Sequence, residues 1–373
     1  MPRLSWTTLV PIVAAVALVL TWGRHPGSLV LALVALVLVG AVLAAVHHAE
    51  VVAHRVGEPY GSLVLAVAVT IIEVGLIVTL MVSTDKDTSG LARDTVFAAV
   101  MITVNGIVGL SLLVGALKHH LAVFNPEGTG AALATVIALA VLCLVVPSVT
   151  TSEPGPEFTG AQLVFAAIAS LVLYGMFVFT QTIRHRDFFL PVTMADDHVS
   201  SAGSFEHQPV DLDADGHADP PTIRATQISM GLLVVSLLAV VGLAKIESPA
   251  IESGVASVGF PQAVVGVVIA LLVLAPESIA AVRAAARNRV QVSLNLALGS
   301  AMASIGLTIP AIAIASIWLD GPLELGLNQL QIVMLMLTVA VSILTVVPGR
   351  AKSLQGGVHL VLFASFLFLT IAP

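Results

Sequence analysis

Charged residues and cysteine are scarce in this sequence. Only 10% of the 373 residues are charged, whereas about a quarter is usual in a soluble domain. The one cysteine, Cys143, lies in an apolar run, so no disulfide can form within the chain. The formal net charge of −7 also argues against a basic surface for nucleic acid. These shortages exclude an ordinary soluble domain, a disulfide scaffold and a nucleic-acid binder.

Apolar residues, in contrast, are abundant and occur in long runs. They make up 58% of the chain, and the mean hydropathy is +1.05. About 20 helical residues cross a bilayer, and the runs lack the alternation of membrane strands. We therefore predict an all-α polytopic membrane protein with about 11 transmembrane helices. The predicted spans lie near residues 7–22, 27–49, 61–83, 94–117, 131–147, 160–182, 226–246, 260–281, 291–318, 327–347 and 355–372.

The distribution of basic residues predicts the orientation. With the N-terminus in the cytoplasm, 11 of the 15 Lys and Arg residues fall in cytoplasmic segments. Arg24, Lys86, Arg93 and Lys245 are the others. An odd number of spans then places the C-terminus outside. No small-residue cleavage site follows the first span, so residues 1–26 are predicted to be a retained helix.

One long polar connection, residues 183–225, divides the rest of the chain. Residues 27–182 would form helices 2–6, and residues 226–373 would form helices 7–11. Because the connection is predicted on the cytoplasmic side, the two halves start on opposite sides of the membrane. Two inverted five-helix repeats, preceded by an extra N-terminal helix, are a common plan for transporters.

Two glutamates interrupt the apolar runs, Glu73 and Glu277. An ionisable residue at the centre of a span costs about 2.5–3.5 kcal/mol on insertion scales and marks a functional site by default. Each glutamate lies in the second helix of its half, so an inverted repeat would bring the two together near the midplane. The alternative is a pair of buried, protonated side chains that only hydrogen-bond neighbouring helices.

Paired carboxylates suit the exchange of cations for protons. A hard cation prefers several oxygen ligands, and two ionised carboxylates repel each other in a low dielectric. The pair should therefore hold either protons or a cation, but not both. Pro276 frees a backbone carbonyl beside Glu277. Further oxygens or room for close approach would come from Thr70, Asn105, Gly299, Ser300 and Ser304, although small residues also serve ordinary membrane packing.

A polar cluster precedes the third helix: His47, His48, Glu50, His54, Arg55 and Glu58. His47, Glu50 and His54 share one helix face. The cluster could form a cytoplasmic vestibule for protons or cations, or it could simply be solvated at the membrane surface. It contains no His-Glu-x-x-His zinc motif.

The long connection contains a second acidic motif. Asp211, Asp213 and Asp215 open it in the manner of a calcium loop, but Thr222 stands where a bidentate glutamate is expected. The motif could be a weak regulatory calcium site, and a flexible solvated linker is the favoured interpretation.

Other function classes are less compatible with the chain. There is no Gly-x-Ser-x-Gly or zinc-protease motif, so we predict a secondary transporter and not an enzyme, with no cofactor. A passive cation channel is a further alternative. Channels, however, commonly gather selectivity groups from rings of subunits or pore loops. No prediction of oligomeric state follows.

Two motifs resemble a known family. They are His54–Leu63 leading to Glu73, and Ala275-Pro276-Glu277-Ser278 followed by Ala284–Ser300. Both resemble the bacterial sodium–calcium/proton antiporters of the cation/calcium exchanger superfamily. The resemblance implies that Glu73 and Glu277 are the essential glutamates of two α-repeats, with Gly299 and Ser300 as the Gly-Ser of the next helix. It also implies alternating access, with the cation bound between the repeats.

One departure from that family concerns the cation. The calcium/proton exchangers of fungi and plants usually carry Gly-Asn just before each glutamate, where this chain has Val69-Thr70 and Val273-Leu274. Bacterial members share the departure and are linked to sodium and potassium as well as calcium. The resemblance therefore implies a Ca²⁺/H⁺ antiporter of the bacterial inner membrane that extrudes its cation. A Na⁺/H⁺ or K⁺/H⁺ antiporter with little calcium activity is the alternative.

Overall fold

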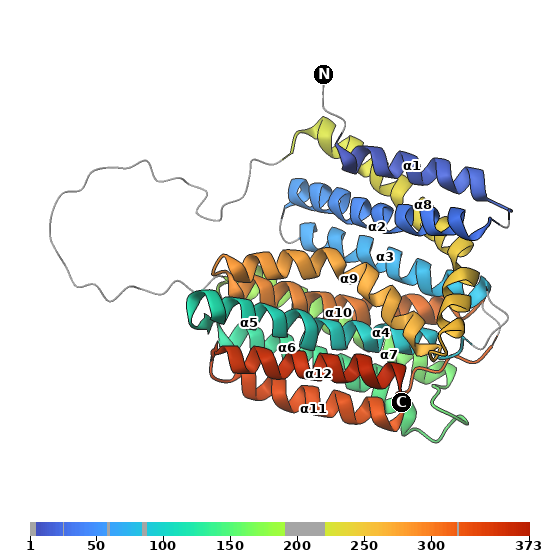
Figure 1. Cartoon of the computed structure of the whole chain (residues 1–373). Helices are drawn as coiled ribbons and strands as arrows, with labels where there is room; N and C mark the ends of the chain where they lie inside the picture. Colours follow the sequence, from blue (N-terminus) through green and yellow to red (C-terminus); the bar gives the residue numbers. More distant parts are fainter. Residues whose placement is uncertain (1–4, 25, 58–59, 84–87, 191–220, 319–320) are drawn as a thin grey trace, which may run out of the picture.

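The computed structural model describes residues 5–24, 26–57, 60–83, 88–190, 221–318 and 321–373, and nearly all of them are helical (Figure 1). Two short strands, β1 (Ala122–Val123) and β2 (Arg350–Ala351), pair antiparallel. In the first part of the chain the helices are α1 (Trp6–Thr21), α2 (Ser28–Val56), α3 (Tyr60–Ser83), α4 (Leu91–Met101), η1 (Ile102–Ile107), α5 (Val108–His119), α6 (Pro126–Ala140), η2 (Val141–Val145), η3 (Val146–Ser148), α7 (Gly160–Phe179), η4 (Thr180–Arg184) and η5 (Arg186–Phe189). After the long connection they are α8 (Ile223–Ser257), α9 (Ala263–Ala286), α10 (Val290–Ala315), α11 (Gln329–Val346) and α12 (Ser353–Ile371).

Ten of the described helical stretches are long and apolar enough to cross a membrane. The predicted first span, α1, has 16 residues and is shorter than a typical crossing helix. The other predicted spans all correspond to helices of the structure. The largest differences in boundary are at α2, which continues to Val56, and at α8, which continues to Ser257, well past the predicted ends near residues 49 and 246.

The ends of the helices follow ordinary capping chemistry. Thr159 caps α7 and Asn328 caps α11, each in a reciprocal bond with the glutamine three residues later. Asn125 caps α6 ahead of Pro126, which fits the first turn because its missing N–H needs no partner there. Polar N-cap residues between the apolar runs thus explain why these helices begin where they do.

The two halves are interrupted differently. In the first half, three helices contain π-helical segments, η1, η2 and η4. In the second half, the helices run through internal prolines, Pro249 in α8, Pro276 in α9 and Pro310 in α10. Both devices remove regular backbone hydrogen bonds inside a membrane helix.

Helices from the two halves interleave across the molecule (Figure 1). α1, α2 and α8 lie at one edge, and α11 and α12 lie at the other. Between them, α3 packs on α10 and α4 packs on α9. The helices that carry Glu73 and Glu277 therefore lie in the interior of the bundle.

Hydrogen bonds tie the helix ends together on two faces. One face, which we call the basic face, includes Lys118, Arg283, Arg287, Arg289 and Arg350. There His119 Nε2 lies 3.2 Å from the Ala286 carbonyl oxygen, and β1 pairs with β2. On the opposite face, the Arg93 guanidinium lies 3.2 Å from the Glu324 carboxylate, and the Leu327 amide donates to the Leu144 carbonyl at 2.8 Å.

Candidate functional site

Glu73 lies on α3 and is held by a helix of the other half. Its side chain is only 3% exposed. The Ser304 hydroxyl donates to Oε1 at 2.6 Å, and the Thr308 hydroxyl donates to Oε2 at 3.1 Å. Both hydroxyls come from α10, where they are four residues apart and so share one face. Each carboxyl oxygen of Glu73 therefore has a fixed partner.

Glu277 lies on α9 in a different environment. It is 9% exposed, and its buried Oε2 has no hydrogen-bond partner within the described residues. The carboxyl lines a cavity of about 260 Å³, and it is near enough to Glu50 and Glu73 to interact with them electrostatically. The cavity lies between α3, α7, α9 and α10 and is lined by Leu65, Ala66, Val69, Tyr174, Phe177, Val178, Gln181, Glu277, Val292, Asn295, Leu296, Gly299, Ser300 and Ala303.

Three of the predicted supporting residues lie beside Glu277. Gly299 and Ser300 line the same cavity, and a Cβ atom added at Gly299 would meet no atom within 4 Å. Pro276 precedes Glu277 within the continuous helix α9, where it cannot donate to the Leu272 carbonyl. A carboxylate, a hydroxyl and a free carbonyl are oxygen ligands of the kind that hard cations prefer.

Two other supporting residues make their bonds elsewhere. The Thr70 hydroxyl donates to the Ala66 carbonyl of its own helix at 2.8 Å. The Asn105 amide donates to the Thr338 hydroxyl at 2.9 Å, and its oxygen lies 3.1 Å from His359 Nδ1. Asn105 thus bonds side chains of α11 and α12, besides Met101 of α4 at 3.7 Å, and none of these bonds joins it to Glu73 or Glu277.

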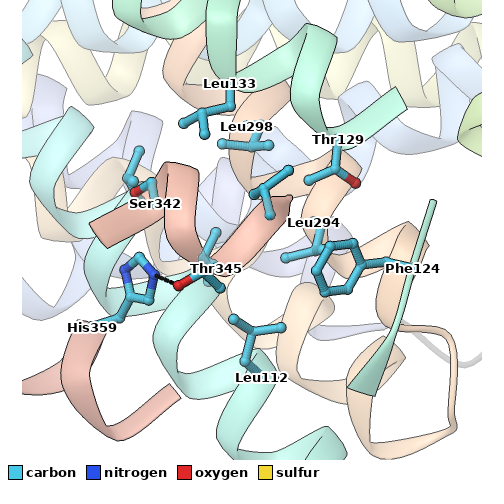
Figure 2. Close-up of a pocket in the computed structure, with 12 residues that line it drawn as sticks. Leu112, Phe124, Thr129, Leu133, Leu294, Leu298, Ser342, Thr345 and His359 are labelled. Atoms are coloured by element: carbon cyan, nitrogen blue, oxygen red, sulfur yellow. Dashed lines mark hydrogen bonds between the residues drawn. The ribbon is translucent and has the colours of Figure 1, made fainter. Parts of the chain in front are cut away.

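The network around Asn105 was not foreseen from the sequence. His359 is buried on α12, and its Nε2 lies 3.1 Å from the Thr345 hydroxyl (Figure 2). Figure 2 also shows the small cavity beside this pair, which is lined mainly by apolar side chains. The signal available in the sequence was a single histidine within the last apolar run. Thr308 was missed too, although its spacing of four from Ser304 was visible.

The described residues of the predicted vestibule all lie on α2, and they differ in how far they are exposed. Glu50 is exposed on α2, and His47 and His54 are half-buried on the same helix. The buried histidine of the cluster is His48. Its Nε2 lies 2.9 Å from the Thr7 carbonyl oxygen of α1, and its Nδ1 lies 3.2 Å from the Ser229 hydroxyl of α8. Glu58 and the acidic motif of Asp211, Asp213 and Asp215 lie outside the described residues.

The acidic and metal-ligating side chains of the site are few. Within the described ranges, no three His, Cys, Asp or Glu residues come together as metal ligands would. A cation between Glu73 and Glu277 would therefore take its other ligands from hydroxyls, backbone carbonyls or water. Such a site suits a transported ion that must leave again, since binding has to be weak enough for release.

A family model described as sodium/calcium exchanger protein matches residues 27–183 and 228–372. The chain belongs to the sodium/calcium exchanger family. The two matched ranges correspond to the two halves of the fold, and they leave out α1 and most of the acidic connection. Membership of this family confirms the prediction of a multi-pass secondary transporter and not an enzyme.

Two relatives of this exchanger cover almost its whole length. The protein y4hA of Sinorhizobium fredii, which bears only the broad name of ionic transporter, is 44% identical over 99% of this chain and 96% of its own. The sodium-potassium/proton antiporter ChaA of Escherichia coli is 33% identical over 97% of this chain and 95% of its own.

Solved exchanger structures share the fold. The structure of YfkE superposes with a TM-score of 0.72 at 15% identity, covering 99% of both chains. The H⁺/Ca²⁺ exchanger CAX gives a TM-score of 0.66 at 14% identity, covering 97% of this chain and 86% of the other. These likenesses confirm the predicted all-α, inverted-repeat architecture.

Proposed function

We propose that this chain is a cation/proton antiporter of a bacterial inner membrane, in which Glu73 and Glu277 alternately bind a cation and protons. The observation that carries the proposal is the placement of two buried carboxylates from opposite halves. Glu73 is bound by hydroxyls of the other half, and Glu277 opens on a cavity. A cation and protons compete for such a pair because each neutralises the same charge.

Ca²⁺ is the proposed principal cation, extruded in exchange for protons. A relative from Aphanothece halophytica, 23% identical over 76% of this chain, is named a Ca²⁺/H⁺ antiporter. Na⁺ or K⁺ is the second candidate, favoured by the 33% identity to ChaA and by the small number of carboxylates in the site. A site with two carboxylates and neutral oxygens is compatible with either class of cation.

The proposed direction of loading follows from the cavity. Its lining residues on α3 and α10 lie toward the N-terminal ends of those helices, which belong to the basic face. The excess of Arg and Lys supports a cytoplasmic location for that face, with the N-terminus inside and the C-terminus outside. A cation from the cytoplasm would then meet Glu277 first, and Glu50 would lie on its approach as part of the vestibule.

Transport in everted membrane vesicles tests the proposal. Vesicles acidified inside receive Ca²⁺, Na⁺ or K⁺ separately, and proton release is followed by fluorescence dequenching. Glu73→Gln and Glu277→Gln should each abolish the response while the protein remains inserted, because neither amide can exchange a proton for a cation. Glu127→Gln, on an exposed carboxylate of α6, should respond like the unmodified chain.

The same vesicles separate the alternatives. Normal exchange in either glutamine variant would refute the site, and cation flux without proton release would indicate a channel. Asparagine at residues 211, 213 and 215 should leave exchange intact if the connection is a linker. Protease added outside everted vesicles should cleave the 191–220 segment, and protection there would reverse the proposed topology.

A further inference from the structure

The cavity beside Glu277 has two facing walls, α7 and α10, which are joined tightly at one end. Tyr174 of α7 lies against Gly306 of α10, where an added Cβ would stand 2.9 Å from the tyrosine Cβ. This distance leaves no room for any side chain at residue 306. Tyr174 itself lines the cavity. The walls therefore meet at the end of the cavity that lies deeper in the bundle.

Phe189 joins the same two walls at the other end. Its ring packs edge-on against Phe177 of α7, with the ring centroids 5.7 Å apart. Its carbonyl oxygen accepts a hydrogen bond from the Asn295 amide of α10 at 2.7 Å. Phe177 and Asn295 both line the cavity, whereas Phe189 does not. Phe189 is 6% exposed and so is buried behind one residue of each wall.

The surrounding bonds fix this arrangement. Gln291 donates to the Asn295 side-chain oxygen at 2.8 Å, which leaves the Asn295 amide nitrogen directed at Phe189. Gln291 in turn accepts the Asn125 backbone N–H at 2.7 Å. On the other side, Gly128 of α6 lies directly against the Phe188 carbonyl oxygen, where any Cβ would collide. The short helix η5 is thereby held between α6, α7 and α10.

We propose that Phe189 clasps α7 to α10 at the basic-face end of the ion cavity and so sets the access of cations to Glu277. The inference rests on the proposed function for the role of the cavity. Alternating access needs helices to move around a fixed site. The two walls are in direct contact at Gly306, whereas at the other end Phe189 joins them. Phe189 is a positioning residue. Its ring contacts Phe177, and its backbone carbonyl accepts the bond from Asn295.

A cysteine reporter in the cavity measures the clasp without relying on transport. Cys143 is first replaced by serine, and Leu296→Cys then places a thiol on the lining. Adding Phe189→Ala should raise the labelling rate of this thiol by a membrane-impermeant maleimide several-fold in everted vesicles. Phe189→Leu, which keeps most of the apolar volume, should restore part of the protection. Phe188→Ala is the matched control, because Phe188 stacks on His185 with ring centroids 5.3 Å apart.

Transport kinetics supply the second measurement. With cysteine-free chains, Phe189→Ala should raise the apparent KM for the cation several-fold while the maximal rate changes less, since Glu73 and Glu277 are untouched. A labelling rate and a KM equal to those of Phe188→Ala would overturn the clasp. If labelling rises but Glu277→Gln still exchanges cations, the proposed function fails and the clasp stands. Monodisperse elution of each variant in detergent excludes misfolding.

Discussion

At the residue scale, the two glutamates differ in how many of their carboxyl oxygens accept a hydrogen bond. Glu73 has a hydroxyl on each oxygen, whereas the Oε2 atom of Glu277 has none among the described residues. Glu277 also faces the cavity. In the proposed cycle Glu277 is therefore the carboxylate that first exchanges its proton for an arriving cation, and Glu73 completes the site from the other half.

Removal of the Ser304 hydroxyl tests the support of Glu73. A hydrogen bond to a charged group contributes about 1.5–3 kcal/mol, so Ser304→Ala should lower kcat/KM for exchange by about tenfold or more. Thr308→Val keeps the shape of the side chain and removes a longer bond, so its effect should be smaller. Ser316→Ala, on a half-buried serine just past the end of the same helix, serves as the control. Equal rates for Ser304→Ala and this control in reconstituted vesicles would contradict the assigned contact.

Prediction from sequence was strongest for residues whose presence in a membrane span needs an explanation. Glu73 and Glu277 stand out because a charge is costly in lipid, and both are buried in the structure. Ser304 and Thr308 carry a weaker signal, because hydroxyls in membrane helices commonly bond their own backbone, and only Ser304 was predicted as a small polar group near the site. The polarity of Asn105 indicated a hydrogen-bond partner but could not identify it as His359, so its support of the ion site stays a prediction.

At the element scale, close packing depends on glycines at particular helix crossings. A Cβ added at Gly266 of α9 would stand 2.9 Å from the backbone nitrogen of Thr95 on α4. Both are backbone positions, so neither helix can relieve the contact by a change of rotamer. Gly266 lies near the N-terminal end of α9. Along this helix, the crossing with α4 is therefore on the other side of Glu277 from the basic face, toward which the cavity lies.

Gly266→Ala should therefore destabilise the protein. Forcing a methyl group into a filled crossing typically costs about 1–3 kcal/mol. Gly231→Ala in α8 is the matched control, since its Cβ would meet nothing within 4 Å, and it should be neutral or stabilising by about 0.5–1 kcal/mol. Unfolding midpoints in detergent measure both. A Gly266→Ala variant as stable as the control would show that the crossing is looser than described.

The positions of the helices could be predicted from the apolar runs, whereas their π-helical segments and some of their ends could not. Each predicted span from residue 27 onward has its helix because about 20 apolar residues must satisfy their backbone bonds internally. The π-helical segments η1, η2 and η4 were not predicted, because an apolar run of this length fits an unbroken α-helix equally well. The extension of α8 to Ser257 was missed because Lys245, Glu247 and Glu252 resemble a polar break, although Glu247 and Glu252 are buried.

At the scale of the whole molecule, the inverted repeat explains how two carboxylates distant in sequence could form the one site proposed for them. α3 and α9 occupy equivalent places in the two halves, and α10 passes close enough to α3 to bind Glu73. The repeat could be predicted because the long connection separates two sets of five spans with opposite starting sides. The cavity on the basic face could not, since it depends on how α7 and α10 pack.

In the proposed mechanism, the cation and protons compete for the Glu73–Glu277 pair. Calorimetric titration of the purified exchanger with Ca²⁺, Na⁺ or K⁺, in buffers of different ionisation enthalpy, counts the protons released when the cation binds. We expect that binding releases protons from the unmodified protein and that the double variant Glu73→Gln/Glu277→Gln neither binds the cation nor releases protons. Cation binding without proton release, or the same release from the double variant, would contradict this competition.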